Sequence, residues 1–274
     1  MLKYINSIKY NITKIFSSKP ESQLTKAEIV KIKHQTDDGT LHHFKKVNRN
    51  FHFKNSLEFI HTYKEIFEEK IYNFKTENHN PIILDCGSNI GLAIIYFKSI
   101  FPGAIIHGFE PDSNNYNVLS TNIRENNLTD ITLHQSAVWI HNNHLQFQSL
   151  GTHASRLSMH DDNANTVNVK CTRLKDFINQ FNNIDFLKID IEGAEDEVIK
   201  DIQEELKKVN NIFLEYHGKT NDTLKLINQL TILKDANFKV YIKNAADLLS
   251  SPFYNKSIND SPFEVQLNIF AYRE

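Results

Sequence analysis

One acidic sequence near the end of a predicted strand has residues suited to catalysis. Residues 188–195 read Lys-Ile-Asp-Ile-Glu-Gly-Ala-Glu, so Asp190 and Glu192 alternate with isoleucine. Side chains at alternate strand positions point to the same face, and both carboxylates would therefore reach one site. A carboxylate can accept a proton from a substrate hydroxyl. We therefore assign Asp190 and Glu192 to a candidate reaction centre.

A second candidate group follows the next predicted strand, where residues 214–218 read Leu-Glu-Tyr-His-Gly. Because the pKa of a histidine lies near neutral pH, His217 is a candidate catalytic base, and a purely structural histidine is the alternative. Glu215 and His217, together with Asp190 and Glu192, would offer oxygen and nitrogen ligands to a hard cation. Their spacing matches no compact metal-binding motif, so we predict no metal.

A third candidate site is the loop at residues 85–91, which reads Asp-Cys-Gly-Ser-Asn-Ile-Gly. Gly87 permits a sharp turn and close approach of a ligand, and a following helix would present free N–H groups. The G-x-x-x-G spacing differs from the G-x-G-x-x-G of dinucleotide-binding loops. Asp85 would repel a pyrophosphate but suits a cation. The loop therefore favours S-adenosylmethionine, which carries a sulfonium and an ammonium group, over NAD.

Residues after the next two predicted strands complete this ligand site. Glu110 follows Gly91 by 19 residues, close to the separation at which an acid reaches ribose hydroxyls in nucleotide-binding folds. After the third strand, Gln135 and Ser136 could hydrogen-bond the edge of an adenine, and Ala137 would leave room for the ring. Ordinary strand-end residues are the alternative for these three positions.

These sites need strands and helices to position them. Short apolar strands alternate with amphipathic helices, which predicts an α/β, Rossmann-like, doubly wound and mostly parallel sheet of seven strands with an antiparallel edge. Lys188 would be buried in a central strand, so we expect it to pair with Asp85 or Asp190. The predicted strands cover residues 82–84, 104–109, 131–133, 186–189, 212–214, 238–242 and 265–270, and the helices cover residues 90–100, 113–126 and 194–207.

The composition changes at Pro81, after a polar linker. We therefore predict a small α+β extension over residues 1–80 and a sheet domain over residues 81–274. Within the extension, residues 37–40 carry a hairpin-type turn signal, and a helix is predicted from residue 55 to about residue 74.

Two segments stand apart from this scheme. Residues 1–19 carry four lysines and no acid, with apolar residues at helical spacing, and they do not look like a cleaved signal. They would form a helix that docks on its own domain or contacts an anionic membrane surface. Residues 140–169 are polar and predict an irregular insert, a hairpin or lid over the strand ends. The favoured interpretation of this segment is a solvated loop, and the alternative is that it clamps an acceptor or binds a metal through His153, His160, Asp161 and Asp162.

Composition excludes several classes of protein. The chain has 274 residues, of which 40% are hydrophobic and 23% charged, as is typical of a folded protein with a core. A formal net charge of −2 argues against nucleic acid as a partner. Two cysteines, and no apolar run of about 18 residues, favour a cytoplasmic protein with at most peripheral membrane contact.

Three sequence blocks together resemble the FkbM-type methyltransferases. They are Leu-Asp-x-Gly-x-Asn-x-Gly from residue 84, Phe-Glu-Pro at 109–111 and Leu-Lys-Ile-Asp-Ile-Glu-Gly-Ala-Glu at 187–195, and the resemblance covers about residues 81–217. The resemblance implies a Rossmann-like enzyme that uses S-adenosylmethionine to methylate a hydroxyl of a sugar, glycan or related small metabolite. A nucleic-acid methyltransferase and a non-catalytic ligand-binding protein are the alternatives.

The resemblance also implies roles for individual residues. Asp190 and Glu192 would lie at the reaction centre. Residues 1–80 and most of 218–274 fall outside the match, so the family does not specify the acceptor. The residues that the match assigns to the cofactor are Asp85, Gly87, Asn89, Gly91 and Glu110.

Overall fold

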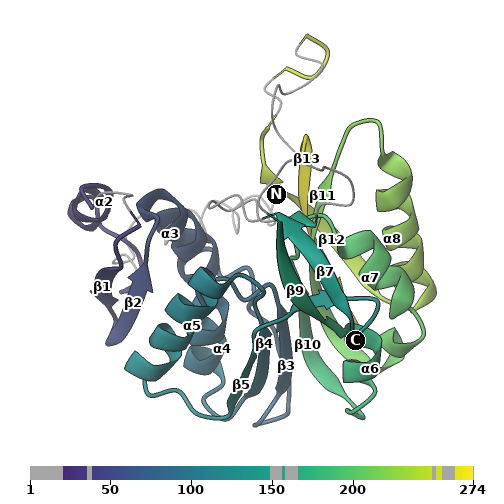
Figure 1. Ribbon diagram of the computed structural model, residues 1–274, viewed down its shortest axis with the longest axis horizontal. Coiled ribbons are helices and arrows are strands. Elements are labelled where there is room, and N and C mark those ends of the chain that lie inside the picture. Colours follow the sequence, from purple (N-terminus) through teal and green to yellow (C-terminus); the bar gives the residue numbers. More distant parts are fainter. Residues whose placement is uncertain are drawn as a thin grey trace, which may run out of the picture. The chain divides into compact units, whose positions relative to one another are not determined.

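The computed structural model describes residues 21–35, 39–148, 156–157, 166–248, 251–254 and 263–273. The chain divides into two compact units, Met1–Ile71 and Tyr72–Glu274 (Figure 1). The division falls at Tyr72 rather than at Pro81. The reason is aromatic packing, since Tyr72 lies 5.8 Å from Phe97 between ring centroids and Phe74 lies 4.9 Å from Phe186. The predicted N-terminal helix, residues 1–19, lies outside the described residues.

The described part of the first unit is a hairpin with two helices. Helix α2 (Lys26–Lys33) precedes strands β1 (His42–Lys46) and β2 (Arg49–Phe53), and α3 (Ser56–Tyr63) continues into a π-helical turn, η1 (Lys64–Glu68). The predicted helix to residue 74 is therefore too long.

The hairpin of the first unit turns at Val47 and Asn48 and not at residues 37–40, part of which lies outside the described residues. Both turn residues have positive φ, 49° and 59°. Positive φ at both central positions is the geometry that matches the twist of two paired strands. The sequence Val-Asn is an uncommon choice for this turn, so the sequence signal was weak.

The second unit contains the predicted seven-stranded sheet. Its order is β12-β13-β11-β10-β3-β4-β5. The five strands from β11 to β5 are parallel, whereas β13 is antiparallel to β11 and β12 is antiparallel to β13. The Rossmann-like α/β fold and its antiparallel edge are therefore confirmed. The strand bounds are β3 Ile82–Cys86, β4 Ile105–Phe109, β5 Ile131–His134, β10 Ile184–Ile189, β11 Val209–Gly218, β12 Lys239–Ala246 and β13 Val265–Tyr272.

Helices cover both faces of this sheet. Figure 1 shows α4 and α5 on one side and α7 and α8 on the other, as a doubly wound fold requires. The predicted helix over residues 194–207 is interrupted, because α7 ends at Asp201 and a 3₁₀ turn, η2, follows. The bounds are α4 Leu92–Ile100, α5 Ser113–Glu125, α6 Leu174–Ile178, α7 Glu195–Asp201, η2 Glu205–Lys208 and α8 Thr223–Asp235.

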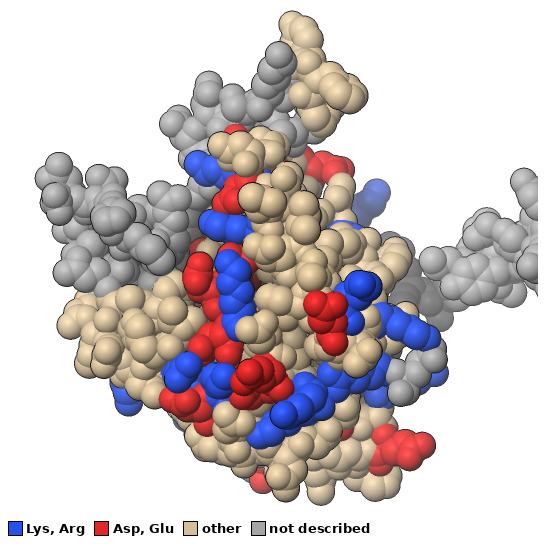
Figure 2. All heavy atoms as spheres, turned by 90° about the vertical axis from the view of Figure 1, so that its right-hand side faces the viewer, with Lys and Arg blue, Asp and Glu red and all other residues tan. Residues whose placement is uncertain are grey.

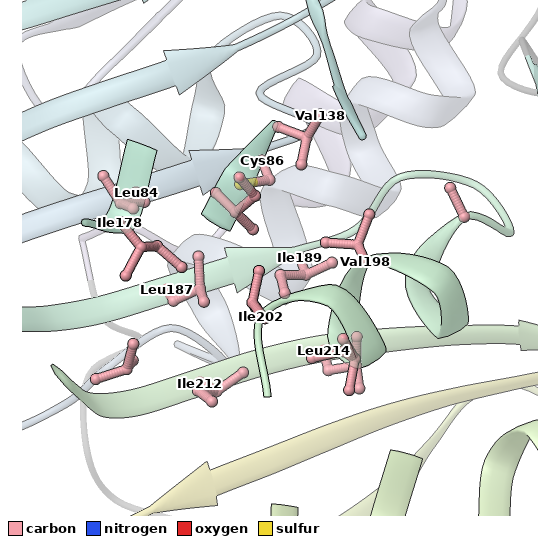
Figure 3. Close-up of a cluster of buried hydrophobic side chains, with 14 of the residues drawn as sticks. Leu84, Cys86, Val138, Ile178, Leu187, Ile189, Val198, Ile202, Ile212 and Leu214 are labelled. Atoms are coloured by element: carbon pink, nitrogen blue, oxygen red, sulfur yellow. The ribbon is translucent and has the colours of Figure 1, made fainter. Parts of the chain in front are cut away.

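The core on the α7 side is built from leucine, isoleucine and valine. Leu84, Leu187 and Leu214 come from β3, β10 and β11, and Val198 and Ile202 come from α7 and the residue after it (Figure 3). All five side chains are fully buried. Burial of each such side chain contributes about 1.5–3 kcal/mol, so this cluster fixes the strand ends relative to the helix.

The insert predicted at residues 140–169 contributes to a second small sheet of order β6-β9-β7-β8, and its described residues form the predicted hairpin rather than an irregular loop. Strand β7 pairs antiparallel with both β9 and β8, and β6 pairs parallel with β9. The strand pattern in residues 166–173 is Thr-Val-Asn-Val-Lys-Cys-Thr-Arg, an alternation that indicates a strand with one solvated face. The bounds are β6 Ala137–Trp139, β7 His144–Gln148, β8 Arg156–Leu157 and β9 Thr166–Arg173. The insert histidines His153 and His160 lie outside the described residues.

Both cysteines, Cys86 and Cys171, are buried free thiols. Among the described helices, none combines the length and apolar composition needed to cross a bilayer.

Candidate active site

The carboxyl ends of three parallel strands bring the predicted site residues to one edge of the sheet. In the β3–β10–β11 register, Ile189 lies opposite Cys86 on one side and Leu214 on the other. The residues that follow these positions therefore leave the sheet next to one another. Ligands of open α/β sheets bind at this edge.

A buried ion-pair network lies beneath the edge. Lys188 Nζ is 3.5 Å from Asp85 Oδ1 and 3.1 Å from Asp190 Oδ2, and it donates a hydrogen bond to the Gly87 carbonyl oxygen at 2.8 Å. The predicted pairing of Lys188 is confirmed with both expected partners. This lysine therefore ties the glycine loop to the central strand.

Electrostatics keep the lysine charged. Burial disfavours the charge, but Asp190, Tyr72 and Asp85 outweigh it and raise the pKa of Lys188 well above its usual value. Burial raises the pKa of Asp85, and Lys188 opposes this rise. Asp85 is fully buried, and neither of its carboxylate oxygens has a hydrogen-bond partner among the described residues. Asp85 thus acts on the edge through its charge.

The glycines of the loop are required by packing within the chain. Gly87 has φ +84°, and a Cβ there would lie 1.8 Å from the Asp190 carbonyl oxygen. Gly91 has φ +87°, and a Cβ there would lie 2.5 Å from Leu119 Cδ1. The sequence pattern had assigned close approach at Gly87 to a ligand, whereas in the structure the neighbouring main chain occupies that space. Asn89 between the glycines also has positive φ, 48°.

Glu110 holds the loop at the end of β4. Its Oε2 accepts a hydrogen bond from Asn89 N at 2.8 Å, and its Oε1 accepts one from Asp112 N at 2.9 Å. Burial raises the pKa of Glu110 to about 7, against the lowering effect of these two hydrogen bonds. Each carboxylate oxygen has a second lone pair, so the side chain retains capacity for ribose hydroxyls.

The three residues predicted at an adenine differ in their surroundings. Gln135 is exposed. Ser136 is buried, and its Oγ is hydrogen-bonded to Thr172 Oγ1 of β9 at 2.8 Å. Ala137 is buried at the start of β6. Their contact with a ligand stays a prediction.

A strained turn after β10 positions Glu192. Glu192 has φ 58° and Gly193 has φ 98°, and a positive φ in a residue other than glycine costs about 1–2 kcal/mol. The carboxylate of Glu195 stabilises the turn by accepting hydrogen bonds from Ile191 N at 3.1 Å and Gly193 N at 2.9 Å. Sequence analysis did not include Glu195 in the site. The sequence feature that could have indicated this role is an acidic residue at the first position of α7, directly after the glycine turn.

His217 lies between three carboxylates. Its Nδ1 is 3.2 Å from Glu195 Oε1, and its Nε2 is 3.7 Å from both Glu192 Oε2 and Glu215 Oε1. Burial disfavours the imidazolium, but the hydrogen bond with Glu195 and the charges of Glu195, Glu192 and Asp190 raise the pKa of His217 to about 10. A histidine that is already protonated at neutral pH is a poor proton acceptor, which argues against the catalytic-base role predicted from its sequence position.

Two partly exposed carboxylates remain in position to contact a substrate. The side chains of Asp190 and Glu192 are 25% and 34% exposed. Burial raises the pKa of Glu192 to about 7, and His217 opposes this rise. Asp190, Glu192 and His217 offer ligand atoms within 4.8 Å of one another, close enough to share one metal ion, although no metal was predicted.

The charge of this edge fits a cationic ligand. The carboxylates of Asp85, Asp190, Glu192, Glu195 and Glu215 outnumber the two cationic side chains, Lys188 and His217. A pyrophosphate would be repelled here, whereas a sulfonium and an ammonium group would be attracted. The residues present therefore fit S-adenosylmethionine better than a dinucleotide.

Comparison with known proteins agrees with this assignment. The family model described as "Methyltransferase FkbM domain" matches residues 85–240. "Methyltransferase 1" of Beauveria bassiana (strain ARSEF 2860) is 26% identical over 216 residues, covering 69% of this chain and 84% of that protein. "Methyltransferase sdnD" of Sordaria araneosa is 30% identical over 190 residues, covering 56% of this chain and 73% of that protein.

The chain is also similar to two solved structures that are named as methyltransferases. The methyltransferase FkbM of Methylobacillus flagellatus KT is 18% identical with a TM-score of 0.47, and the match covers 73% of this chain but only 45% of that one. Precorrin-6y C5,15-methyltransferase of Geobacter metallireducens GS-15 is 13% identical with a TM-score of 0.44, covering 87% and 96% of the two chains. Because the family model spans more than half of the sequence, the chain belongs to the FkbM methyltransferase family.

Proposed function

We propose that this protein transfers a methyl group from S-adenosylmethionine to a hydroxyl oxygen of a sugar, a glycan or a related small metabolite. The observation that carries the proposal is the excess of carboxylates at the ends of β3, β10 and β11, beside the glycine loop. When bound, S-adenosylmethionine supplies a methyl group activated by the positive sulfur.

The cofactor site in this proposal follows the edge of the sheet. The charge of Asp85 and Asp190 attracts the cationic end, and Glu110 accepts hydrogen bonds from the ribose hydroxyls. Helix α4 begins at Leu92, and its N-cap residue, Gly91, offers no side-chain cap, so the first N–H groups of the helix can bind a polar group of the ligand. The residues proposed to contact the cofactor are Asp85, Gly87, Asn89, Gly91, Glu110, Gln135, Ser136 and Ala137.

The acceptor side of the proposal rests on Asp190 and Glu192. Both carboxylates are partly exposed, so either can accept the hydrogen bond of an acceptor hydroxyl and then its proton. In the metal-free protein His217 is protonated, and its imidazolium attracts the Glu192 carboxylate. Alignment of the acceptor oxygen with the methyl carbon supplies about 7–11 kcal/mol of the barrier reduction, and the carboxylates provide that alignment.

A nucleic-acid acceptor is not favoured. Figure 2 shows acidic side chains interspersed among the basic ones on the visible face. Proteins that bind a phosphate backbone collect lysine and arginine on one face. A membrane contact through residues 1–19 stays a prediction, because these residues lie outside the described part of the chain.

The proposal is tested with methyl-labelled S-adenosylmethionine and separate cell fractions that contain envelope sugars, small metabolites and nucleic acid. We expect label in an alkali-stable methyl ether. Asp190→Asn should lower the rate at least about a hundredfold, whereas Asp176→Asn, on α6 and away from the site, should not. Label that enters only nucleic acid, or only alkali-labile esters, contradicts the proposed acceptor class.

A further inference from the structure

We propose that Asp190, Glu192 and His217 form a binding site for one divalent cation of the manganese or magnesium class. One ligand atom from each residue lies within 4.8 Å of the others. In an octahedral site with bonds of about 2.1 Å, opposite ligand atoms are about 4.2 Å apart. The three side chains therefore need only small inward movements to coordinate one ion.

The two distances from Nε2 of His217 to neighbouring carboxylates are too long for direct hydrogen bonds, but they suit atoms that bind one common ion. Nε2 is 3.7 Å from Glu192 Oε2 and 3.7 Å from Glu215 Oε1, beyond the usual hydrogen-bond length of about 3.2 Å. Adjacent ligands of a small divalent ion stand about 3 Å apart. The Nε2 atom thus faces a position between carboxylate oxygens.

The orientation of the imidazole is fixed from the opposite side. The His217 side chain is only 2% exposed, and its Nδ1 lies 3.2 Å from the buried Glu195 carboxylate. Histidines that bind metals commonly donate their second N–H group to a carboxylate, which selects the tautomer and directs the other nitrogen to the ion. Glu195 is itself held by the N–H groups of Ile191 and Gly193. The arrangement is therefore organised before an ion binds.

The local charge is the second argument for a cation. Two like charges about 4 Å apart repel by about 4 kcal/mol at an effective dielectric constant of 20. Lys188 contacts Asp190 through Oδ2, and it also contacts Asp85 and the Gly87 carbonyl oxygen. Its positive charge is therefore shared among these groups. A divalent ion that replaces the Nε2 proton of His217 would offset the repulsion between Asp190 and Glu192.

The ligand chemistry selects the class of ion. Carboxylates suit magnesium, calcium and manganese, whereas imidazole suits transition metals. Among the ions that carboxylates favour, manganese is the transition metal and therefore the one best suited to an imidazole as well. A role for the ion in polarising an acceptor hydroxyl would rest on the proposed function, but ion binding itself does not depend on it.

Binding is measured by electron paramagnetic resonance on the full chain freed of metals, with Mn²⁺ alone and neither cofactor nor acceptor. We expect one equivalent of Mn²⁺ to lose its free-ion spectrum, and pulsed spectra of the bound ion to show coupling to an imidazole nitrogen. Glu192→Gln should weaken binding at least about tenfold. Glu204→Gln, an exposed acid on the protein surface, should leave it unchanged.

Three results would overturn the site. They are no Mn²⁺ binding below about 1 mM, binding without nitrogen coupling, or equal affinity in a folded Glu192→Gln variant and the wild type. Circular dichroism checks folding, and if Glu192→Gln does not fold, the nitrogen coupling of the wild-type protein decides. Cofactor binding is titrated separately on the metal-free protein, so that failure of the ion site and failure of the methyl-transfer proposal give different results.

Discussion

The carboxylate of Glu195 lies 3.2 Å from Nδ1 of His217 through Oε1, and both side chains are almost completely buried. The same carboxylate accepts the N–H groups of Ile191 and Gly193. One side chain therefore controls two features of the site. It fixes the positive-φ turn that carries Glu192, and it stabilises the charge of His217.

Replacement of Glu195 should disturb both features. In metal-free Glu195→Gln protein we expect a lower pKa for His217, because the neutral amide does not favour the imidazolium. Long-range ¹⁵N NMR of the histidine ring across pH 6–10 measures this change. Glu204→Gln serves as the control. An unchanged His217 titration in the folded variant would show that Glu195 does not set its charge.

The buried network at Lys188 should be sensitive to loss of the cation. Lys188→Met leaves Asp85 and Asp190 without their partner, and breaking a buried pair in this way costs about 3–5 kcal/mol. Adding Asp85→Asn removes one of the uncompensated charges and should restore part of the loss. Urea unfolding of the single and double variants gives both values. A loss below about 1 kcal/mol for Lys188→Met would contradict the network.

The glycine loop offers a matched steric test. Gly87 and Gly39 have nearly equal φ angles, +84° and +83°, but a Cβ at Gly87 meets the Asp190 carbonyl oxygen whereas a Cβ at Gly39 meets nothing within 4 Å. Gly39→Ala should therefore cost only the conformational strain of about 1–2 kcal/mol. Gly87→Ala should cost at least about 3 kcal/mol more. Equal losses in thermal or urea unfolding would mean that the loop moves away from β10 at little cost.

The raised pKa of Glu110 makes a prediction about pH. Its value rises from 4.5 to about 7 on folding because the carboxyl group is buried. Between these pH values the folded state binds more protons than the unfolded state, so stability falls as pH rises. The full effect is about 3 kcal/mol, at 1.36 kcal/mol per pKa unit.

The pH effect is isolated by comparing wild type with Glu110→Gln. Between pH 4.5 and pH 8 the free energy of unfolding should fall less in Glu110→Gln than in wild type, because glutamine does not ionise. Glu204→Gln should retain the wild-type slope. If wild type and Glu110→Gln lose equal stability over this range, Glu110 is ionised in the folded protein throughout.

The alternation of strands and helices could be predicted because the parallel strands are buried on both faces and read as short apolar runs. The pairing of Lys188 followed from the cost of leaving a charge alone in such a strand. The role of Glu195 could not be predicted, because it depends on the positive φ angles of Glu192 and Gly193. Strand β9 was missed because its solvated face makes the segment look polar.

The role of His217 shows a further limit of sequence analysis. Histidine is assigned as a base from its ordinary pKa, but here the carboxylates of Glu195, Glu192 and Asp190 raise that value. All three belong to the segment that follows β10, whereas His217 lies in β11. The charge state therefore depends on the tertiary arrangement of the strand ends.

The central claim is that the acidic edge beside the glycine loop binds S-adenosylmethionine. Isothermal titration of the purified chain with S-adenosylmethionine, its demethylated product and NAD tests it most directly. We predict one site that binds the two adenosyl compounds, with affinity at least about tenfold weaker in Glu110→Gln, and no binding of NAD. Heat from NAD and none from S-adenosylmethionine would contradict the claim.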